Sequence, residues 1–125
     1  MAEIVQLNEG MATTRFLINK PVLKIGRDPA SDISIDDALV SKEHALIEVV
    51  ASAEKEGEVE YYIKDLDSTN NTYINEQKVT RQQLKNNDVL RVGLNHFKFV
   101  DDNKEDFEKT KTLHKSWFPG VFYTK

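Results

Sequence analysis

The sequence of 125 residues contains no cysteine. This absence excludes disulfide bonds, thiolate metal sites and cysteine nucleophiles, and it suits a reducing compartment. No apolar run is long enough to cross a membrane, and the first ten residues, MAEIVQLNEG, lack the basic start and apolar stretch of a signal peptide. We therefore expect a cytoplasmic protein without membrane insertion, with a nuclear location left open for a eukaryotic source.

An excess of basic residues is also lacking. The 17 Lys and Arg residues are outnumbered by 21 Asp and Glu residues, so the formal net charge is −4. A net acidic domain lacks the broad positive field of a non-specific nucleic-acid binder, so we expect no nucleic-acid partner. The three histidines, His44, His96 and His114, show no paired metal-ligand spacing, and we expect neither a metal nor a cofactor.

Short alternating segments separated by turn residues fill most of residues 1–101. In VEYYI, for example, Val59, Tyr61 and Ile63 would share one face of a strand. This period of two, with its enrichment in β-branched and aromatic residues, predicts half-buried strands, and no window in this range convincingly predicts a helix. Many short strands with regular turns indicate an all-β domain, either a sandwich or a barrel.

The character of the sequence changes over residues 102–125. A charged stretch is followed by the only tryptophan, and Phe107, Thr110, His114 and Trp117 would fall roughly on one face of a helix. We expect this extension to be a tail packed on the domain or a linker. A docking segment is the alternative, because exposed aromatic side chains are common in interaction sites.

Three polar segments lie between predicted strands: Gly26-Arg27, VSKEH at 40–44, and DLDSTNNTYIN at 65–75. Each of them alone could be an ordinary surface turn. Together they would bring a guanidinium, hydroxyls and amides to one end of the domain, which is a donor set suited to a phosphate dianion. The amide of Asn70 could in addition hold an extended peptide main chain.

Catalysis is a competing interpretation of Ser41, which precedes His44 by three residues. A serine hydrolase needs a nucleophile on a strained turn, an orienting acid and an oxyanion hole, and no G-x-S-x-G pattern is present. We therefore expect no enzymatic activity. His44 is instead expected to be a buried histidine whose ring nitrogens tie neighbouring loops together.

The order and spacing of these residues resemble the forkhead-associated (FHA) domain, a family of phosphothreonine-binding β-sandwiches. The family pattern appears here as Gly26-Arg27, Ser41-Lys42-Glu43-His44 and Asn70-Asn71-Thr72 followed by Asn75. The resemblance covers roughly residues 4–101. It implies an antiparallel β-sandwich of about eleven short strands over residues 1–101, with binding loops at one end, followed by the extension at 102–125.

The resemblance also implies binding roles by position. Arg27 would pair with the phosphate, and Ser41 would donate its hydroxyl to a phosphate oxygen with Lys42 close by. Thr69 would help to form the pocket, and Asn70 would hold the ligand main chain on either side of the phosphothreonine.

Four further residues would be structural members of the motif. Gly26 would let the loop leave its strand, and His44 would hold the loop that carries Ser41. Asn71 replaces the glycine of the family pattern, and it can supply a positive φ if the turn needs one. Asn75 is assigned to loop structure.

The implied function is a phosphothreonine-dependent protein-binding module for signalling or assembly. Its partner would be a phosphothreonine-containing protein made by a Ser/Thr kinase. The alternative is a phosphate-independent scaffold or protein-interaction domain of the same fold. If a kinase modified Thr110 or Thr112, the domain could also bind its own tail.

Overall fold

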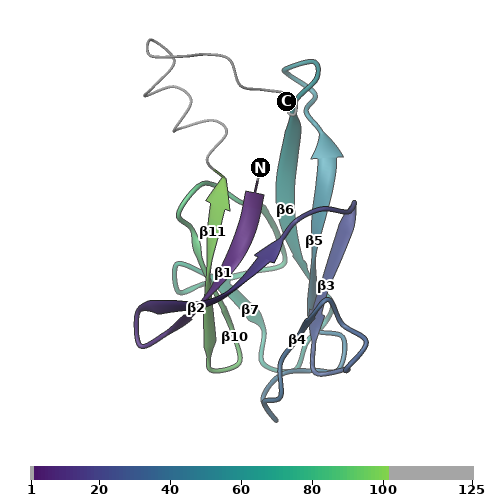
Figure 1. Ribbon diagram of the computed structural model, residues 1–125. Helices are drawn as coiled ribbons and strands as arrows, with labels where there is room; N and C mark the ends of the chain where they lie inside the picture. The colour runs from purple at the N-terminus through teal and green to yellow at the C-terminus, as the bar shows by residue number, and fades with distance from the viewer. Residues whose placement is uncertain (1, 102–125) are drawn as a thin grey trace.

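All regular structure in residues 2–101, the part of the chain that the computed structural model describes, is β-strand (Figure 1). The strands are β1 (Ala2–Asn8), β2 (Met11–Leu17), β3 (Val22–Gly26), β4 (Ile33–Ser34), β5 (Ala45–Ala51), β6 (Val59–Asp65), β7 (Thr72–Ile74), β8 (Gln77–Val79), β9 (Arg81–Gln83), β10 (Val89–Val92) and β11 (Asn95–Asp101). The predicted all-β class is confirmed. The predictions for residues 102–125, and for a domain boundary at their start, lie outside the described residues.

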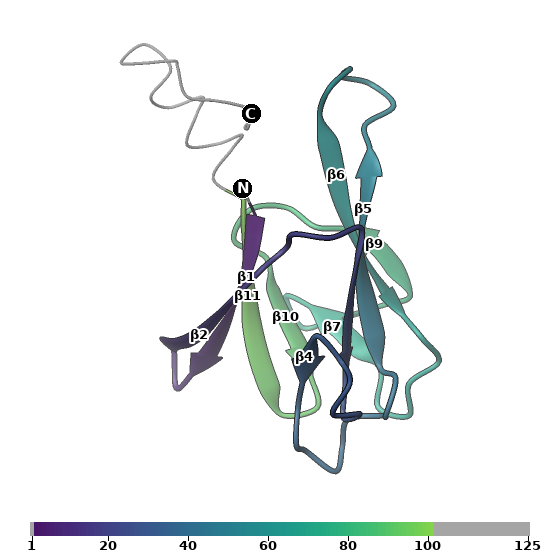
Figure 2. The same cartoon turned by 45° about the vertical axis from the view of Figure 1, so that its right-hand side comes forward.

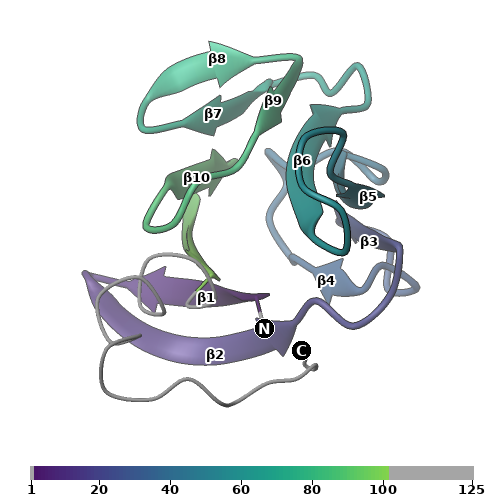
Figure 3. The same cartoon turned by 90° about the horizontal axis from the view of Figure 1, so that it is seen from above.

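The strands form two sheets that face one another, which confirms the sandwich (Figures 1 and 3). The first sheet has the order β2-β1-β11-β10-β7-β8, and the second has the order β4-β3-β5-β6-β9. Strand pairs within the described residues are antiparallel, except that the two-residue β4 runs parallel to β3 and pairs Ile33 with Ile25. Side chains from the inner faces of both sheets meet between them, as in other face-to-face sandwiches.

The alternation in the sequence places one side of most strands in a single core. Phe97 and Phe99 of β11 are 1% exposed, and the Phe99 ring lies 5.3 Å from the Tyr61 ring of the opposite sheet. Tyr61 and Ile63 are buried as the period of two predicts, but Val59 is 40% exposed. Val59 opens β6 beside the loop at 52–58, where the chain leaves the sandwich, so position along the strand overrides the pattern.

Two segments extend beyond the packed body of the sandwich. The hairpin of β1 and the edge strand β2 points away from the second sheet, and the side chains of β2 other than Phe16 are exposed (Figure 2). The loop at 52–58 joins β5 to β6 as a polar hairpin connection. Residues 2–101 contain no helix that is long and apolar enough to span a membrane.

The register of the second sheet brings three connecting loops to one end. Ala45, at the start of β5, pairs with both Ile25 near the end of β3 and Asp65 at the end of β6. The loops that follow β3, precede β5 and follow β6 are therefore neighbours, at the lower end in Figure 1. Arg27, residues 40–44 and residues 66–71 of the third polar segment lie on these loops.

Candidate functional site

A shallow depression of about 320 Å³ lies where these loops meet. All five predicted binding residues line it, together with the loop before β5; the lining is Arg27, Ala38, Leu39, Val40, Ser41, Lys42, Thr69 and Asn70. The described residues also form a smaller depression of about 180 Å³ beside β6, which Glu60, Tyr61 and Asp101 help to line. Its lining includes two carboxylates and one cation, Lys85, so it suits an anion less well than the loop depression does.

Arg27 is exposed at the rim of the depression and held through its inner nitrogen. Its backbone N–H donates to the Ser41 carbonyl at 3.0 Å, and its Nε donates to the Val40 carbonyl at 2.9 Å. No carboxylate within residues 2–101 forms an ion pair with it. The two terminal nitrogens of the guanidinium therefore remain available to an incoming anion, in the fork geometry that suits a phosphate.

Ser41 is oriented by the neighbouring loop. Its Oγ accepts a hydrogen bond from the Thr69 backbone N–H at 3.0 Å. Because that bond uses an oxygen lone pair, the hydroxyl hydrogen is left to donate elsewhere. Lys42 follows directly and is exposed, so a cation and a hydroxyl donor adjoin the Arg27 guanidinium on the same depression.

His44 is fully buried and links two of the three loops. Its Nδ1 accepts the Ser41 backbone N–H at 3.0 Å, so its Nε2 carries the hydrogen and donates to the Asn71 carbonyl at 2.9 Å. The prediction of a satisfied, loop-tying histidine is confirmed. Both ring nitrogens are occupied and the Ser41 hydroxyl faces Thr69 instead, so these two residues do not form a nucleophile and its base.

Asn70 and Asn71 shape the loop after β6. Asn70 Nδ2 donates to the Leu39 carbonyl at 2.9 Å, which leaves its second amide hydrogen and its Oδ1 for a ligand. Asn71 has φ of 67°, which confirms that this position needs the left-handed conformation. Asn tolerates that conformation through local hydrogen bonding, so the replacement of the family glycine keeps the turn.

Asp65 is the internal anchor of this loop, and the sequence analysis missed it. Its carboxylate accepts hydrogen bonds from the Ser68 hydroxyl and backbone N–H and from the buried Thr72 hydroxyl. Burial raises the pKa of Asp65, but the hydrogen bonds from Ser68 and Thr72 lower it more, so the net pKa lies below its usual range. The loop is thus fastened from inside while Thr69 and Asn70 stay exposed.

Gly26 lies where two backbone segments approach closely, and its φ is not positive. Its predicted role, to let the loop leave β3, stays a prediction. A Cβ built at this position would lie 2.1 Å from the backbone oxygen of Lys42. Gly26 therefore lets the loop before β5 approach β3 closely, and that approach brings Ser41 and Lys42 beside Arg27.

Asp37 organises the loop before β5 and was also missed. One of its carboxylate oxygens accepts the Leu39 backbone N–H at 2.9 Å, and the other accepts the Leu94 N–H at 3.0 Å and Asn95 Nδ2 at 2.9 Å. These bonds, led by the one from Leu39, hold the pKa of Asp37 below its usual range. Asp37 thereby ties the β10–β11 turn to the loop whose Leu39 and Val40 carbonyls hold Asn70 and Arg27.

Replacing Asp37 by asparagine should destabilise the protein near neutral pH by about 1–2 kcal/mol. In asparagine an amide nitrogen, which is a donor, replaces one of the two carboxylate oxygens. Depending on its orientation, the variant loses either the bond from Leu39 or the bonds from Leu94 and Asn95. Because the folded pKa of Asp37 is lowered, its contribution is present above the unfolded value of 3.8 and disappears as the pH falls through the folded pKa. Urea unfolding from pH 7 to pH 3 should show the gap between wild type and variant closing below about pH 4.

The neighbouring Asp36 provides the matched control for this measurement. It is exposed and has no hydrogen-bond partner among the described residues. Asp36→Asn should therefore leave the free energy of unfolding within about 0.5 kcal/mol of wild type. Equal stability of the two variants at pH 7 would contradict the role given to Asp37.

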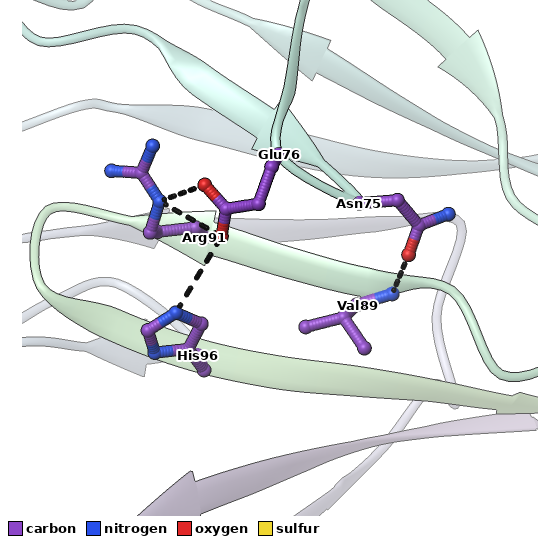
Figure 4. Close-up of polar contacts among 5 residues, drawn as sticks. All are labelled: Asn75, Glu76, Val89, Arg91 and His96. Carbon is purple, nitrogen blue, oxygen red and sulfur yellow. Dashed lines mark hydrogen bonds and ion pairs between the residues drawn. The ribbon is translucent and has the colours of Figure 1, made fainter.

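Asn75 lies away from the depression, at the turn between β7 and β8. Figure 4 shows its side-chain oxygen directed at the Val89 backbone N–H, which donates to it at 3.0 Å. Beside it, Glu76 lies between Arg91 and His96, with Arg91 Nε at 3.0 Å and His96 Nε2 at 3.8 Å from its carboxylate oxygens. This geometry supports the structural role that the sequence analysis predicted for Asn75.

The chemistry available at the depression is that of anion binding. A guanidinium, an ammonium group, a hydroxyl and an amide converge there, while the Ser41–His44 geometry does not suit nucleophilic attack. Within residues 2–101, no cluster of His, Cys, Asp or Glu residues could hold a metal ion. The site can therefore hold an oxygen-rich anion.

Comparison with known proteins gives a consistent result. The model of the FHA domain family matches residues 23–93. The chain is 36% identical over 95 residues to the glycogen accumulation regulator GarA of Mycolicibacterium smegmatis, a match that covers 76% of this chain and 56% of that protein. It is 38% identical over 82 residues to the oxoglutarate dehydrogenase inhibitor of Corynebacterium efficiens, covering 66% of this chain and 53% of that protein. The chain thus spans about half the length of these curated relatives.

A solved structure from a structural and functional analysis of phosphothreonine-dependent FHA domain interactions matches the fold with a TM-score of 0.66. The two chains are 25% identical, and the match covers 81% of this chain and 97% of the other.

Proposed function

Because the chain belongs to the FHA domain family, we propose that it is a protein-binding module that recognises phosphothreonine in its partners through the loop depression at one end of the sandwich. The observation that carries the proposal is the convergence of Arg27, Ser41 and Lys42 with Thr69 and Asn70 on one surface. These residues come from three loops that are distant in the sequence.

The proposed roles follow from the free hydrogen-bonding groups. The terminal guanidinium nitrogens of Arg27 and the hydroxyl of Ser41 would donate to phosphate oxygens, with the Lys42 ammonium nearby. Thr69 would border the phosphothreonine, and Asn70 would bond to the ligand main chain. Each hydrogen bond to a charged group contributes roughly 1.5–3 kcal/mol. After the entropy of ordering a peptide is deducted, two or three such bonds give affinity of roughly micromolar order.

Binding should weaken in acid because the phosphate loses charge. The second pKa of phosphothreonine is about 6, so the dianion is converted to the monoanion below that pH. We expect the affinity for a phosphothreonine peptide, measured by fluorescence anisotropy, to be constant from pH 8 to 7 and to fall by roughly threefold or more between pH 7 and 5. Circular dichroism at each pH would verify that the domain stays folded. Constant affinity across this range would contradict recognition of the dianion.

The proposal is tested with three degenerate peptide libraries that carry phosphothreonine, phosphoserine or unmodified threonine at a fixed central position. Selective binding of the phosphothreonine library would support the proposal and would give the flanking preference. Equal binding of all three libraries, or none, would instead favour a phosphate-independent scaffold.

The partner is defined here by its chemistry. We propose a protein that a Ser/Thr kinase has phosphorylated on threonine, in a signalling or assembly process. The relatives are named as a regulator and an inhibitor, which accords with a module that acts by binding. Self-binding through phosphorylated Thr110 or Thr112 is tested in the same assay with phosphopeptides of those sequences.

A further inference from the structure

A row of basic side chains crosses the outer face of the second sheet. The strand register places Lys24 of β3 opposite Leu46 of β5, Leu46 opposite Lys64 of β6, and Lys64 opposite Arg81 of β9. We name Lys24, Leu46, Lys64 and Arg81 the basic row. The inner-facing neighbours Ile47 and Ile63 are buried, so the alternation of the strands directs the row outward. Figure 1 shows β3, β5 and β6 side by side at this face.

The register of Lys64 and Arg81 is unfavourable for the isolated domain. Like charges directly opposite one another on a sheet face destabilise it. Arg81 is compensated, since its Nε lies 3.1 Å from Glu48 Oε1 and its guanidinium stacks 4.1 Å from the centre of the Tyr62 ring. Lys64 and the Lys24 ammonium form no ion pair with another described residue. The two exposed lysines lie on either side of half-buried Leu46 and lack a direct ion pair. Asp32 adjoins Lys24 and accepts its backbone N–H at 2.8 Å, but its carboxylate is paired with Lys20.

Charge on this face is segregated along the strands. Glu48 and Tyr62 form the next cross-strand pair, and Glu60 lies one pair further toward the 52–58 hairpin. The Glu60 carboxylate receives the Tyr62 hydroxyl at 3.0 Å. Glu48 and Glu60 are therefore engaged and lie toward the hairpin end, while the cations of the basic row lie nearer the end that carries the binding loops. Asp32, beside Lys24, is engaged by Lys20. This arrangement occurs in a chain whose net charge is −4, so it does not reflect a general excess of cations.

The basic row borders the proposed phosphothreonine site. Lys24 precedes Gly26 by two residues, Leu46 follows His44 by two residues, and Lys64 directly precedes Asp65. Two residues of strand correspond to about 7 Å. Across the four strands the row spans about 14 Å, because neighbouring strands lie roughly 4.8 Å apart. An extended chain of about four or five residues covers that length.

We propose that the basic row binds a short acidic stretch of the same partner segment that carries the phosphothreonine. The inference rests on the proposed function and adds a second contact to it. Aspartate or glutamate side chains would pair with Lys24 and Lys64 and relieve the repulsion between Lys64 and Arg81, while Leu46 would contact the aliphatic part of the segment. The phosphate site then provides dependence on phosphorylation, and the basic row selects among phosphorylated partners by their charge.

The test uses phosphothreonine peptides with about four random residues on each side of the phosphothreonine and a run of about five glutamates or five glutamines at one end. Both placements of the run, before and after the random region, are measured by anisotropy at low and at high salt. For one placement, we expect the glutamate peptide to bind about three- to tenfold more tightly than the glutamine peptide, with the difference shrinking as salt screens the charges.

The decisive variant is Lys24→Gln/Lys64→Gln. It should bind the glutamine peptide as wild type does and should lose the preference for glutamate. Lys78→Gln/Lys98→Gln, with the same charge change on strands of the other sheet, should keep the preference. Lys64→Gln alone should leave the thermal midpoint equal to or above that of wild type, because it removes a like-charge pair.

The outcomes separate the two proposals. Equal affinity of wild type for glutamate and glutamine peptides at both placements, with binding that still depends on phosphate, overturns the basic row and leaves the proposed function standing. A glutamate preference that survives in Lys24→Gln/Lys64→Gln also overturns it, since the attraction then comes from other cations. Absence of phosphate-dependent binding by every peptide overturns the proposed function and the basic row together.

Discussion

Substitution of Arg27 by alanine is expected to lower the affinity for phosphothreonine peptides by about 2–4 kcal/mol, or roughly 30- to 1,000-fold. The reason is that Arg27 supplies the main counter-charge for the phosphate, with both terminal nitrogens unpaired by carboxylates within residues 2–101. Isothermal titration calorimetry with a phosphothreonine peptide from the library would measure the loss.

The fold should survive this substitution because the Arg27 side chain is exposed and its side-chain bond runs to a single backbone carbonyl. Arg15→Ala is the matched control. Arg15 is also exposed, pairs with Glu3 and lies on β2 at the edge of the other sheet. Its removal should change peptide affinity by less than about twofold. Wild-type affinity in Arg27→Ala would reject the site assignment.

Gly26→Ala is expected to destabilise the domain by about 3 kcal/mol or more and to abolish phosphothreonine binding. The added methyl group would lie 2.1 Å from the Lys42 carbonyl oxygen and 2.9 Å from its carbon. A backbone atom cannot turn aside as a flexible side chain can, so the loop that carries Ser41 and Lys42 would have to move away from β3. Thermal and urea unfolding would measure the stability, and anisotropy at low temperature would measure binding.

Gly10→Ala separates this steric effect from the general cost of removing a glycine. Gly10 has φ of 82°, but a Cβ there would meet nothing within 4 Å. The cost should be that of a left-handed alanine, about 1 kcal/mol, with peptide affinity unchanged. If Gly26→Ala were no more destabilising than Gly10→Ala, the close approach of the two backbones would not be the reason for glycine at position 26.

Local sequence patterns were sufficient to predict the longer strands and to pick out the motif residues, but not the three-residue strands β8 and β9. Alternation of apolar residues predicts which side chains of a strand are buried, since successive side chains point to opposite faces whatever the partner strand. Tyr61 and Ile63 followed this rule. Because asparagine tolerates a positive φ, the sequence also indicated that Asn71 could form a left-handed turn, and its φ of 67° agrees with that prediction. The convergence of the loops at one end was a hypothesis from the donor set of the three polar segments, and the resemblance of the motif then gave each residue a role.

Contacts between segments distant in the sequence were decided by the tertiary structure alone. Asp37 meets Leu94 across 57 positions, Gly26 is constrained by the Lys42 carbonyl, and Lys64 faces Arg81 because of the strand register. A local pattern specifies the conformation and the buried face of a segment, but not the neighbour with which it pairs. The packing of the two sheets determines that neighbour. It makes Asp37 the anchor of the loop before β5, and it aligns Lys24 and Lys64, which are far apart in the sequence, in a row beside the site.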